Sequence, residues 1–186
     1  MNLNLKCCGK ENPIGVDQER VRLHFDTDGS GEIVSYTIEI KEQATGKSIC
    51  TLSGDGFTVW VPSAVLQERT AYTWQVSAKL SDGAAVQSHT ACFETGVQMW
   101  QGKWIGTDAQ SGRVLEFRKK FAVKNSLRKA RLYICGVGYF QPKLNGQKLT
   151  DSYFIPPVTD YATRPQLPRA TSGHHITYYT YDATKL

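Results

Sequence analysis

The sequence contains few of the residues that typify helical or disulfide-rich proteins. It has only 2 Met and few runs of Ala, Leu and Glu at helical spacing, whereas Gly, Tyr and Phe number 16, 9 and 7. Its 5 Cys are odd in number and include no Cys-x-x-Cys spacing, which argues against both a disulfide framework and a zinc site. The composition favours strands and turns, so the fold class we expect is all-β.

Hydrophobic segments long enough to cross a bilayer are also missing. No stretch approaches the roughly 20 apolar residues that a membrane helix needs. The first residues, 1–9, lack the basic end and apolar core of a signal peptide. We therefore expect no membrane partner. The compartment stays open, because a cytoplasmic protein and an exported one whose signal peptide has been removed both fit this sequence.

The net charge of +5 is not evenly spread along the chain. Between Arg113 and Arg131, 8 Lys or Arg residues accompany a single acid, Glu116. The basic residues alternate with apolar ones, as on the solvent side of a strand. No nucleic-acid-reading motif accompanies them, so we expect no nucleic-acid partner.

Residues 1–97 have the pattern of a β-sandwich of fibronectin III or immunoglobulin type. Apolar and polar residues alternate over residues 21–26, 36–41 and 71–80, with Trp74 on the inward side. Turn residues separate about six or seven such short strands. Tyr72 follows Leu66 by six positions, which resembles the tyrosine corner, where the phenol bonds to the preceding backbone.

Reactive side chains in these residues have ordinary structural interpretations. Cys50 and Cys92 lie in apolar strands and are expected to be buried free thiols. His24, on the polar side of its strand, is expected to be solvated. No nucleophile, base and orienting acid come together here, so we expect no catalytic residue in this part.

The composition changes at residues 96–104, and we place a domain boundary between residues 97 and 98. Trp100 and Trp104 are expected to lie in an interdomain core. Strands are predicted over residues 114–123 and 129–134. A hairpin is predicted at Asn145-Gly146, because its type I′ turn needs positive φ at both central residues.

Seven short motifs follow one another along about 90 residues, from the end of the first part through the second. They are Phe-Glu-Thr-Gly (93–96), Trp-x-x-x-Trp-Ile-Gly (100–106), Arg-Lys-x-Phe (118–121), Ala-Arg-Leu-Tyr-Ile-x-Gly-x-Gly-Tyr (130–139), Asn-Gly (145–146), Thr-x-Tyr-x-x-Arg (159–164) and Tyr-x-x-Tyr-Asp-Ala-Thr (178–184). Each is weak alone, but their order is specific. In this order the chain resembles the amino-terminal part of bacterial α-L-rhamnosidases of glycoside hydrolase family 78, which have Val at the position of Ala183.

The resemblance implies a fibronectin III-like sandwich over residues 1–97 and the beginning of a jelly roll over residues 98–186. It places the family's catalytic acids in an (α/α)6 barrel that would follow Leu186. We therefore expect an incomplete jelly-roll-like sandwich, no catalytic residue and no cofactor in this chain, and the absent C-terminal barrel as its partner. Unpaired strand edges would favour self-association. Whether the chain counts as an enzyme is left open.

The resulting hypothesis is an accessory region that also recognises rhamnose-containing glycans. Pyranose C–H faces stack on aromatic rings, and hydroxyl groups bind planar polar groups. The candidate carbohydrate-binding residues are Tyr153, Asp160, Tyr161 and Arg164. Turn capping is the competing interpretation of Asp160, and it is the one we favour for both Asp160 and Asp182.

Two other functions are weighed against this hypothesis. An adhesion or protein-interaction module of fibronectin III type would explain the first part, but a tandem array should repeat, and no repeat follows residue 100. A metal site at His174 and His175 is disfavoured, because adjacent strand residues point apart and no acidic or thiol partner is near. The sequence assigns no role to the loop at residues 165–175, which departs from the family pattern.

Overall fold

The computed structural model describes residues 2–29, 31–54, 56–108, 114–123, 126–157 and 176–186. Strands and two single-turn 3-10 helices make up its regular structure. In chain order the elements are β1 (Leu3–Cys7), β2 (Ile14–Val16), η1 (Gln18–Arg20), β3 (Arg22–Thr27), β4 (Ile33–Glu42), β5 (Ser48–Gly54), β6 (Thr58–Trp60), η2 (Ser63–Val65), β7 (Ala71–Leu80), β8 (Ala85–Gln87), β9 (Ala91–Thr95), β10 (Arg131–Cys135), β11 (Lys143–Leu144), β12 (Gln147–Lys148) and β13 (Tyr178–Asp182). No helix of these residues is long and apolar enough to cross a membrane. The all-β fold class is confirmed.

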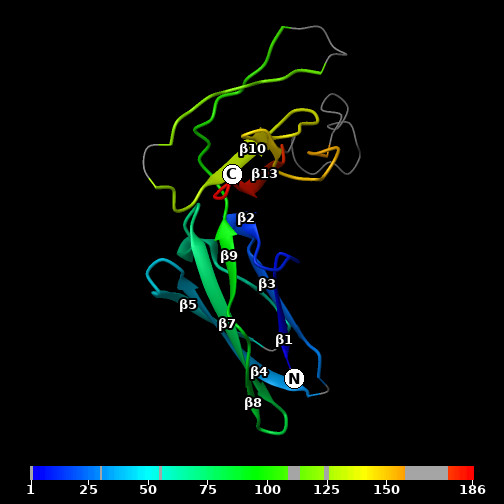
Figure 1. Cartoon of the computed structure of the whole chain (residues 1–186). Helices are drawn as coiled ribbons and strands as arrows, with labels where there is room; N and C mark the ends of the chain where they lie inside the picture. The colour runs from blue at the N-terminus through cyan, green and yellow to red at the C-terminus, as the bar shows by residue number, and fades with distance from the viewer. Residues whose placement is uncertain (1, 30, 55, 109–113, 124–125, 158–175) are drawn as a thin grey trace.

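The first nine strands form an immunoglobulin-like sandwich. One sheet has the order β1-β3-β6, and the other has the order β2-β9-β7-β4-β5 with β8 added alongside β7. Their pairings are antiparallel except for that of β2 with β9. Figure 1 shows the sandwich as an elongated body with the N-terminus near one end, and the residues from 100 onward gathered at the other end.

Two strands near the N-terminus, β1 and β2, lie outside the predicted alternating segments, and the stretch after β7 forms two strands, β8 and β9, with an interruption between them. The interruption lies at Ser88, whose hydroxyl accepts a hydrogen bond of 2.9 Å from the backbone of Val76 and donates one of 2.7 Å to the carbonyl of His89. A side chain that bonds the neighbouring backbone competes with the regular ladder. It thereby separates β8 from β9.

The core lies between the two sheets and follows the predicted alternation. In β7 the buried residues are Tyr72, Trp74, Val76, Ala78 and Leu80. Tyr72 stacks on Phe93 with 5.2 Å between ring centroids. The Tyr72 hydroxyl also accepts a hydrogen bond of 2.7 Å from the backbone N–H of Gln67. The tyrosine-corner interpretation is therefore confirmed.

The cysteines differ from the prediction in their burial. Cys50 and Cys92 are free thiols, as expected, but they are half-buried, and Cys7 is the buried one. The reason is position in the sheet, since Cys7 points between the sheets and the other two lie on outward or edge positions. His24 was expected to be solvated but is half-buried, and its Nδ1 lies 2.9 Å from the hydroxyl of Thr58, so it is only partly solvated.

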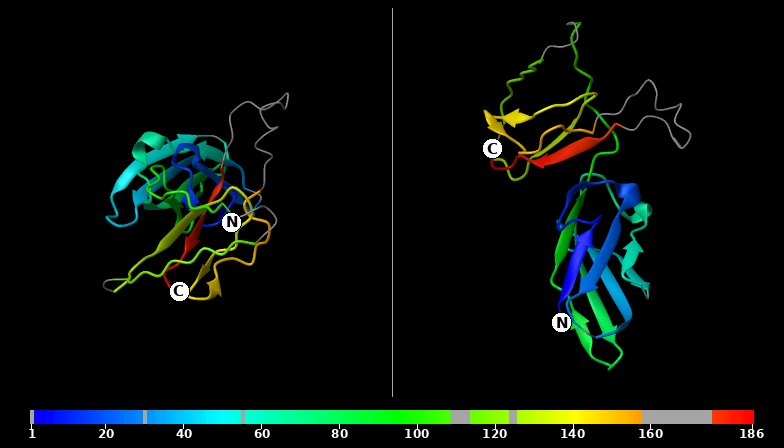
Figure 2. Two further views of the ribbon diagram at one scale, coloured as in Figure 1. Left: turned by 90° about the horizontal axis from the view of Figure 1, so that it is seen from above. Right: turned by 90° about the vertical axis from the view of Figure 1, so that its right-hand side faces the viewer.

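The residues after 100 form two small antiparallel sheets, β10 with β13 and β11 with β12. The second is the predicted hairpin, and Asn145 and Gly146 have φ angles of 50° and 82°. Figure 2 shows both small sheets at the end of the sandwich, with the segment before β10 extending away from them. The prediction of a strand over residues 129–134 is confirmed by β10.

Two predictions for the segment before β10 are wrong. Residues 114–123 form no strand, because none of the described residues pairs with them, and they are exposed throughout. Trp100 and Trp104 are 43% and 66% exposed and do not form an interdomain core. Trp100 only meets the edge of the Tyr178 ring, at 5.4 Å between centroids.

Candidate functional site

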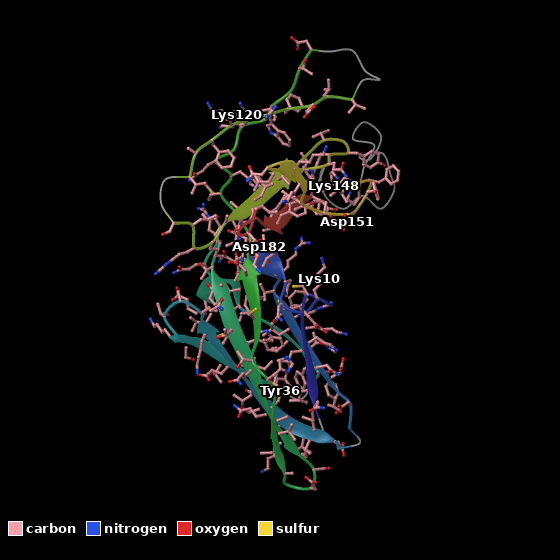
Figure 3. All side chains as sticks on the ribbon, in the orientation of Figure 1. Lys10, Tyr36, Lys120, Lys148, Asp151 and Asp182 are labelled. Carbon is pink, nitrogen blue, oxygen red and sulfur yellow. The ribbon has the colours of Figure 1, made fainter. Side chains whose placement is uncertain are left out.

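The predicted carbohydrate-binding residues can be followed in the structure only at Tyr153. Its ring is 70% exposed, and the ammonium of Lys148 lies 5.6 Å from the ring centroid. Figure 3 labels Lys148 and Asp151 near one another in this part of the molecule. Asp160, Tyr161 and Arg164 lie outside the described residues, so their grouping with Tyr153 stays a prediction. His174, His175 and the loop at 165–175 lie outside them as well.

The most buried ion pairs of the described residues lie where the sandwich meets the sheet of β10 and β13. Glu94 is near the end of β9, between β2 and β7, and its side chain is only 5% exposed. Its carboxylate receives the ammonium of Lys129 at 2.8 Å and the guanidinium of Arg131 at 3.0 Å. The Nε of Arg131 donates to the same carboxylate at 3.1 Å, so the arginine binds with two nitrogens.

Arg131 extends this network to the last strand. Its Nη1 lies 2.8 Å from Asp182, its cross-strand neighbour on β13. Asp182 also accepts hydrogen bonds from the hydroxyl and the backbone N–H of Thr184, at 2.6 and 3.0 Å. These hydrogen bonds are the main cause of the lowered pKa of Asp182, and the charges of Arg131 and Lys129 lower it further. The turn-capping interpretation of Asp182 is confirmed, and Figure 3 places it at the junction.

Two glycines let the backbone of the sandwich approach this sheet closely. A Cβ atom added at Gly15 would overlap the side chain of Thr180, and one added at Gly96 would overlap the phenol of Tyr178. Gly15 also has a φ of 74°, which favours glycine on its own account. The junction is therefore closely packed as well as charged.

Residues 96–99, which follow β9, are held by a third carboxylate. Glu68 accepts hydrogen bonds from the backbone N–H groups of Gln98 and Met99, at 2.8 and 3.0 Å, and pairs with Arg69 at 2.6 Å. The two backbone hydrogen bonds, and then Arg69, lower the pKa of Glu68 to about 2. Glu68 thus ties the backbone at Gln98 and Met99 to the sandwich.

Sequence reasoning did not identify Glu94 or Arg131 as interacting residues. Both lie in recognised motifs, at 93–96 and 130–139. The sequence alone gives no signal at Glu94, because the burial of the last three residues of β9 is visible only in the structure. A buried carboxylate needs a cationic partner, and only the structure shows which cations meet it.

This junction suits a structural role better than a catalytic one. A general acid in glycoside hydrolysis needs a raised pKa, whereas the pKa of Asp182 is lowered and the carboxylate of Glu94 is occupied by two cations. Among the described residues, no group of three or more His, Cys, Asp or Glu side chains could hold a metal ion. The arrangement fixes the sheet of β10 and β13 against the sandwich.

A pair of adjacent thiols is the other unusual chemical group. Cys8, with a φ of 50°, is exposed beside the buried Cys7. A hydrogen bond from the Cys7 thiol favours the Cys8 thiolate, with help from the backbone N–H of Arg22, and lowers the pKa of Cys8 to about 6. The same hydrogen bond and burial raise the pKa of Cys7.

We expect Cys8 to be the cysteine that alkylates first at neutral pH. The thiolate is the nucleophile, and burial raises the pKa of Cys50, Cys92 and Cys135. The reaction rate with iodoacetamide, followed by peptide mass spectrometry, should rise through a midpoint near pH 6. Cys8→Ser should abolish this phase, and a midpoint above about pH 8, the value of a free cysteine, would contradict the thiol-pair geometry.

Comparison with known proteins adds the family. The model described as "Rha78A-like, N-terminal immunoglobulin domain" matches residues 3–99, and the model described as "Alpha-L-rhamnosidase N-terminal domain" matches residues 125–186. An α-L-rhamnosidase of Formosa agariphila is 30% identical, over 69% of this chain and 15% of its own length. The structure of an α-L-rhamnosidase from Dictyoglumus thermophilum is similar over 98% of this chain and 23% of its own, with a TM-score of 0.73 and 21% identity.

The first family model covers more than half of the 186 residues, so the chain belongs to the family of Rha78A-like N-terminal immunoglobulin domains. With the second model and the curated relative, this makes it an N-terminal region of an α-L-rhamnosidase. The likeness to the solved structure shows the fold. The chain spans less than a quarter of either relative.

Proposed function

We propose that this chain is a non-catalytic accessory region of an α-L-rhamnosidase. In this proposal the hydrolysis of terminal α-L-rhamnosides takes place in a C-terminal (α/α)6 barrel of the parent protein, meaning the longer polypeptide of which this chain would be a part. The chain packs against that catalytic part and takes a share in carbohydrate recognition. The matches of both halves to rhamnosidase N-terminal families support this function over a general adhesion module.

The observation that carries the packing proposal is the exposed segment at residues 114–123. Its apolar side chains lie in solvent with no strand beside them in the described part of the chain; they are Val114, Leu115, Phe117, Phe121 and Val123. Basic residues alternate with them, as on a strand with one buried face, and Figure 3 shows Lys120 on this outlying stretch. Contiguous exposed apolar residues mark an interaction surface.

The relatives indicate what covers this segment. This chain spans 15% of the curated relative and 23% of the solved one, so most of each relative is available as a neighbour of the matching region. A second copy of the chain is the competing occupant, as expected for unpaired edges. We infer that another part of the parent protein covers the segment.

The proposal of carbohydrate recognition has its support at Tyr153. Its ring is largely exposed, so a sugar can reach it, and the ammonium of Lys148 beside the ring is a donor for sugar hydroxyl groups. Asp160, Tyr161 and Arg164 complete the proposed group.

Phe117→Ser should destabilise the parent protein and leave this chain alone nearly unaffected. Phe117 is 52% exposed here, so its loss should change the unfolding free energy of the chain by less than about 0.5 kcal/mol. In the parent it should cost about 2–4 kcal/mol, because a phenylalanine is then removed from an interface. Thermal unfolding of both proteins measures this, and Lys120→Ser is the control on the solvent side.

Activity assays and light scattering complete this test. The chain alone should release no nitrophenol from 4-nitrophenyl α-L-rhamnoside, and turnover by the purified chain would contradict a non-catalytic role. Equal effects of Phe117→Ser in the chain and the parent would refute the packing proposal. So would a dimer of the chain that Phe117→Ser dissociates, because the occupant would then be a second copy.

A further inference from the structure

The outer face of the three-stranded sheet carries an aromatic ring among polar side chains. Directly opposite residues of antiparallel strands point to the same face. In this sheet Arg22 lies opposite Trp60, and His24 lies opposite Thr58. Lys6 of β1 lies opposite His24 on its other side. We call Lys6, Arg22, His24, Thr58 and Trp60 the Trp60 face. The right-hand view of Figure 2 shows β1 and β3 side by side in this sheet.

The indole of Trp60 is both exposed and braced. It is 59% exposed, on the strand β6, which among the strands that the structure describes pairs with β3 alone. The guanidinium of Arg22 lies 5.9 Å from the ring centroid, at the distance of a cation–π contact. A single exposed aromatic residue is ordinary on a protein surface, but Trp60 lies on a strand beside the guanidinium of Arg22, whose N–H groups are hydrogen-bond donors.

The charges around the ring are unequally satisfied. Asp26, at the far end of the face, accepts a hydrogen bond of 2.7 Å from Asn4. His24 is bonded to Thr58 at 2.9 Å. Among the described residues neither Arg22 nor Lys6 has a carboxylate within ion-pair distance. Arg22, directly opposite Trp60, and Lys6, across β3 on β1, are therefore two cations of this face without a carboxylate partner.

The Cys8 thiol lies at the rim of this face. Its sulfur is 3.4 Å from the carbonyl oxygen of Arg20 and 3.5 Å from the backbone nitrogen of Arg22. It thus contacts the backbone of Arg22, while the guanidinium of that residue lies over the indole. Within the part of the chain that the structure describes, the guanidinium makes no ion pair with a carboxylate, so its donors can bind a ligand above the sheet.

We propose that the Trp60 face binds an acidic polysaccharide. A pyranose ring stacks its C–H face on the indole of Trp60, and a carboxylate of the sugar chain accepts hydrogen bonds from Arg22, whose planar fork matches it, and from Lys6. A neutral glycan would offer no carboxylate to either cation. Two cations are few for a nucleic acid, which is bound through many phosphate contacts. This site is separate from Tyr153 and from the exposed segment, so its test is independent of the proposed function.

The test is binding of the intact chain to polygalacturonate, measured by calorimetry. Trp60→Ala should weaken binding about tenfold, the effect of losing one stacking contact. The double change Lys6→Gln with Arg22→Gln should weaken it further and flatten its dependence on salt. Trp104→Ala and Lys41→Gln, an exposed tryptophan and a lysine away from the face, should leave the affinity unchanged.

Ligand controls separate the ring from the charge. Methyl-esterified polygalacturonate keeps the sugar rings and loses the carboxylates, and poly-glutamate keeps the carboxylates and has no sugar. Both should bind at least tenfold more weakly. Equal binding of either control ligand, an unchanged affinity in Trp60→Ala, or no binding by the unsubstituted chain would overturn the proposal. Trp60→Phe, which keeps a ring, should retain intermediate affinity, and this distinguishes lost stacking from a misfolded edge strand.

Discussion

Replacing Trp74 by Ala should unfold the sandwich or leave it barely stable. Trp74 is 1% exposed and lies opposite Ile40 of β4 and Ala91 of β9, in the middle of the larger sheet. Removing a buried tryptophan leaves a cavity and costs about 3–5 kcal/mol. That loss is comparable with the whole stability of a small domain, which is roughly 5–15 kcal/mol. Urea unfolding followed by far-UV circular dichroism measures it.

Two other variants decide whether burial is the cause. Trp60→Ala removes the same side chain from an exposed position and should change stability by less than about 1 kcal/mol. The indole N–H of Trp74 has no hydrogen-bond partner in the described structure, so Trp74→Phe loses packing alone and should cost less than Trp74→Ala. A melting temperature of Trp74→Ala within two degrees of that of the unsubstituted chain would show that Trp74 of β7 does not point into the core.

The parts of the fold that could be predicted are those where a local signal and burial agree. The alternation over 71–80 is the period of a strand with one face in the core, and β7 has that burial. Asn145-Gly146 needs positive φ at both positions for its turn, and the structure has it. In these cases a few consecutive residues determine the backbone, so no knowledge of distant neighbours is needed.

The segment 114–123 shows why the same reasoning failed elsewhere. Its alternation resembles that of β7, although Lys119 interrupts the apolar face. A strand also needs a neighbour that supplies backbone hydrogen bonds, and the described residues supply none. An alternating pattern therefore reports a capacity to form a strand, while the presence of a partner decides whether one forms. Likewise, the candidate site was predicted on loop residues, whereas the polar groups that the structure does bring together, such as Glu94 and Arg131, come from positions 37 residues apart.

Replacing Glu94 by Ala should loosen the junction between the sandwich and the sheet of β10 and β13. The change removes the anion that pairs with Arg131, whose side chain is only 15% exposed, and with Lys129. Breaking a buried ion pair costs about 3–5 kcal/mol when the remaining charge stays uncompensated. Arg131 keeps Asp182 as a partner at 2.8 Å, so we expect the lower end of that range.

Amide hydrogen exchange locates the effect and a matched variant calibrates it. Protection should fall in β10 and β13 while the amides of β7 keep theirs, because the sandwich has its own core. Glu39→Ala breaks an ion pair of similar length, 2.9 Å to Lys41, between side chains that are 44% and 42% exposed, and such pairs contribute about 0–1 kcal/mol. Adding Arg131→Met to Glu94→Ala should restore part of the loss, since no buried cation is then left unpaired. Equal protection in Glu94→Ala and Glu39→Ala would mean that close packing at Gly15 and Gly96, and not the ion pairs, holds the two parts together.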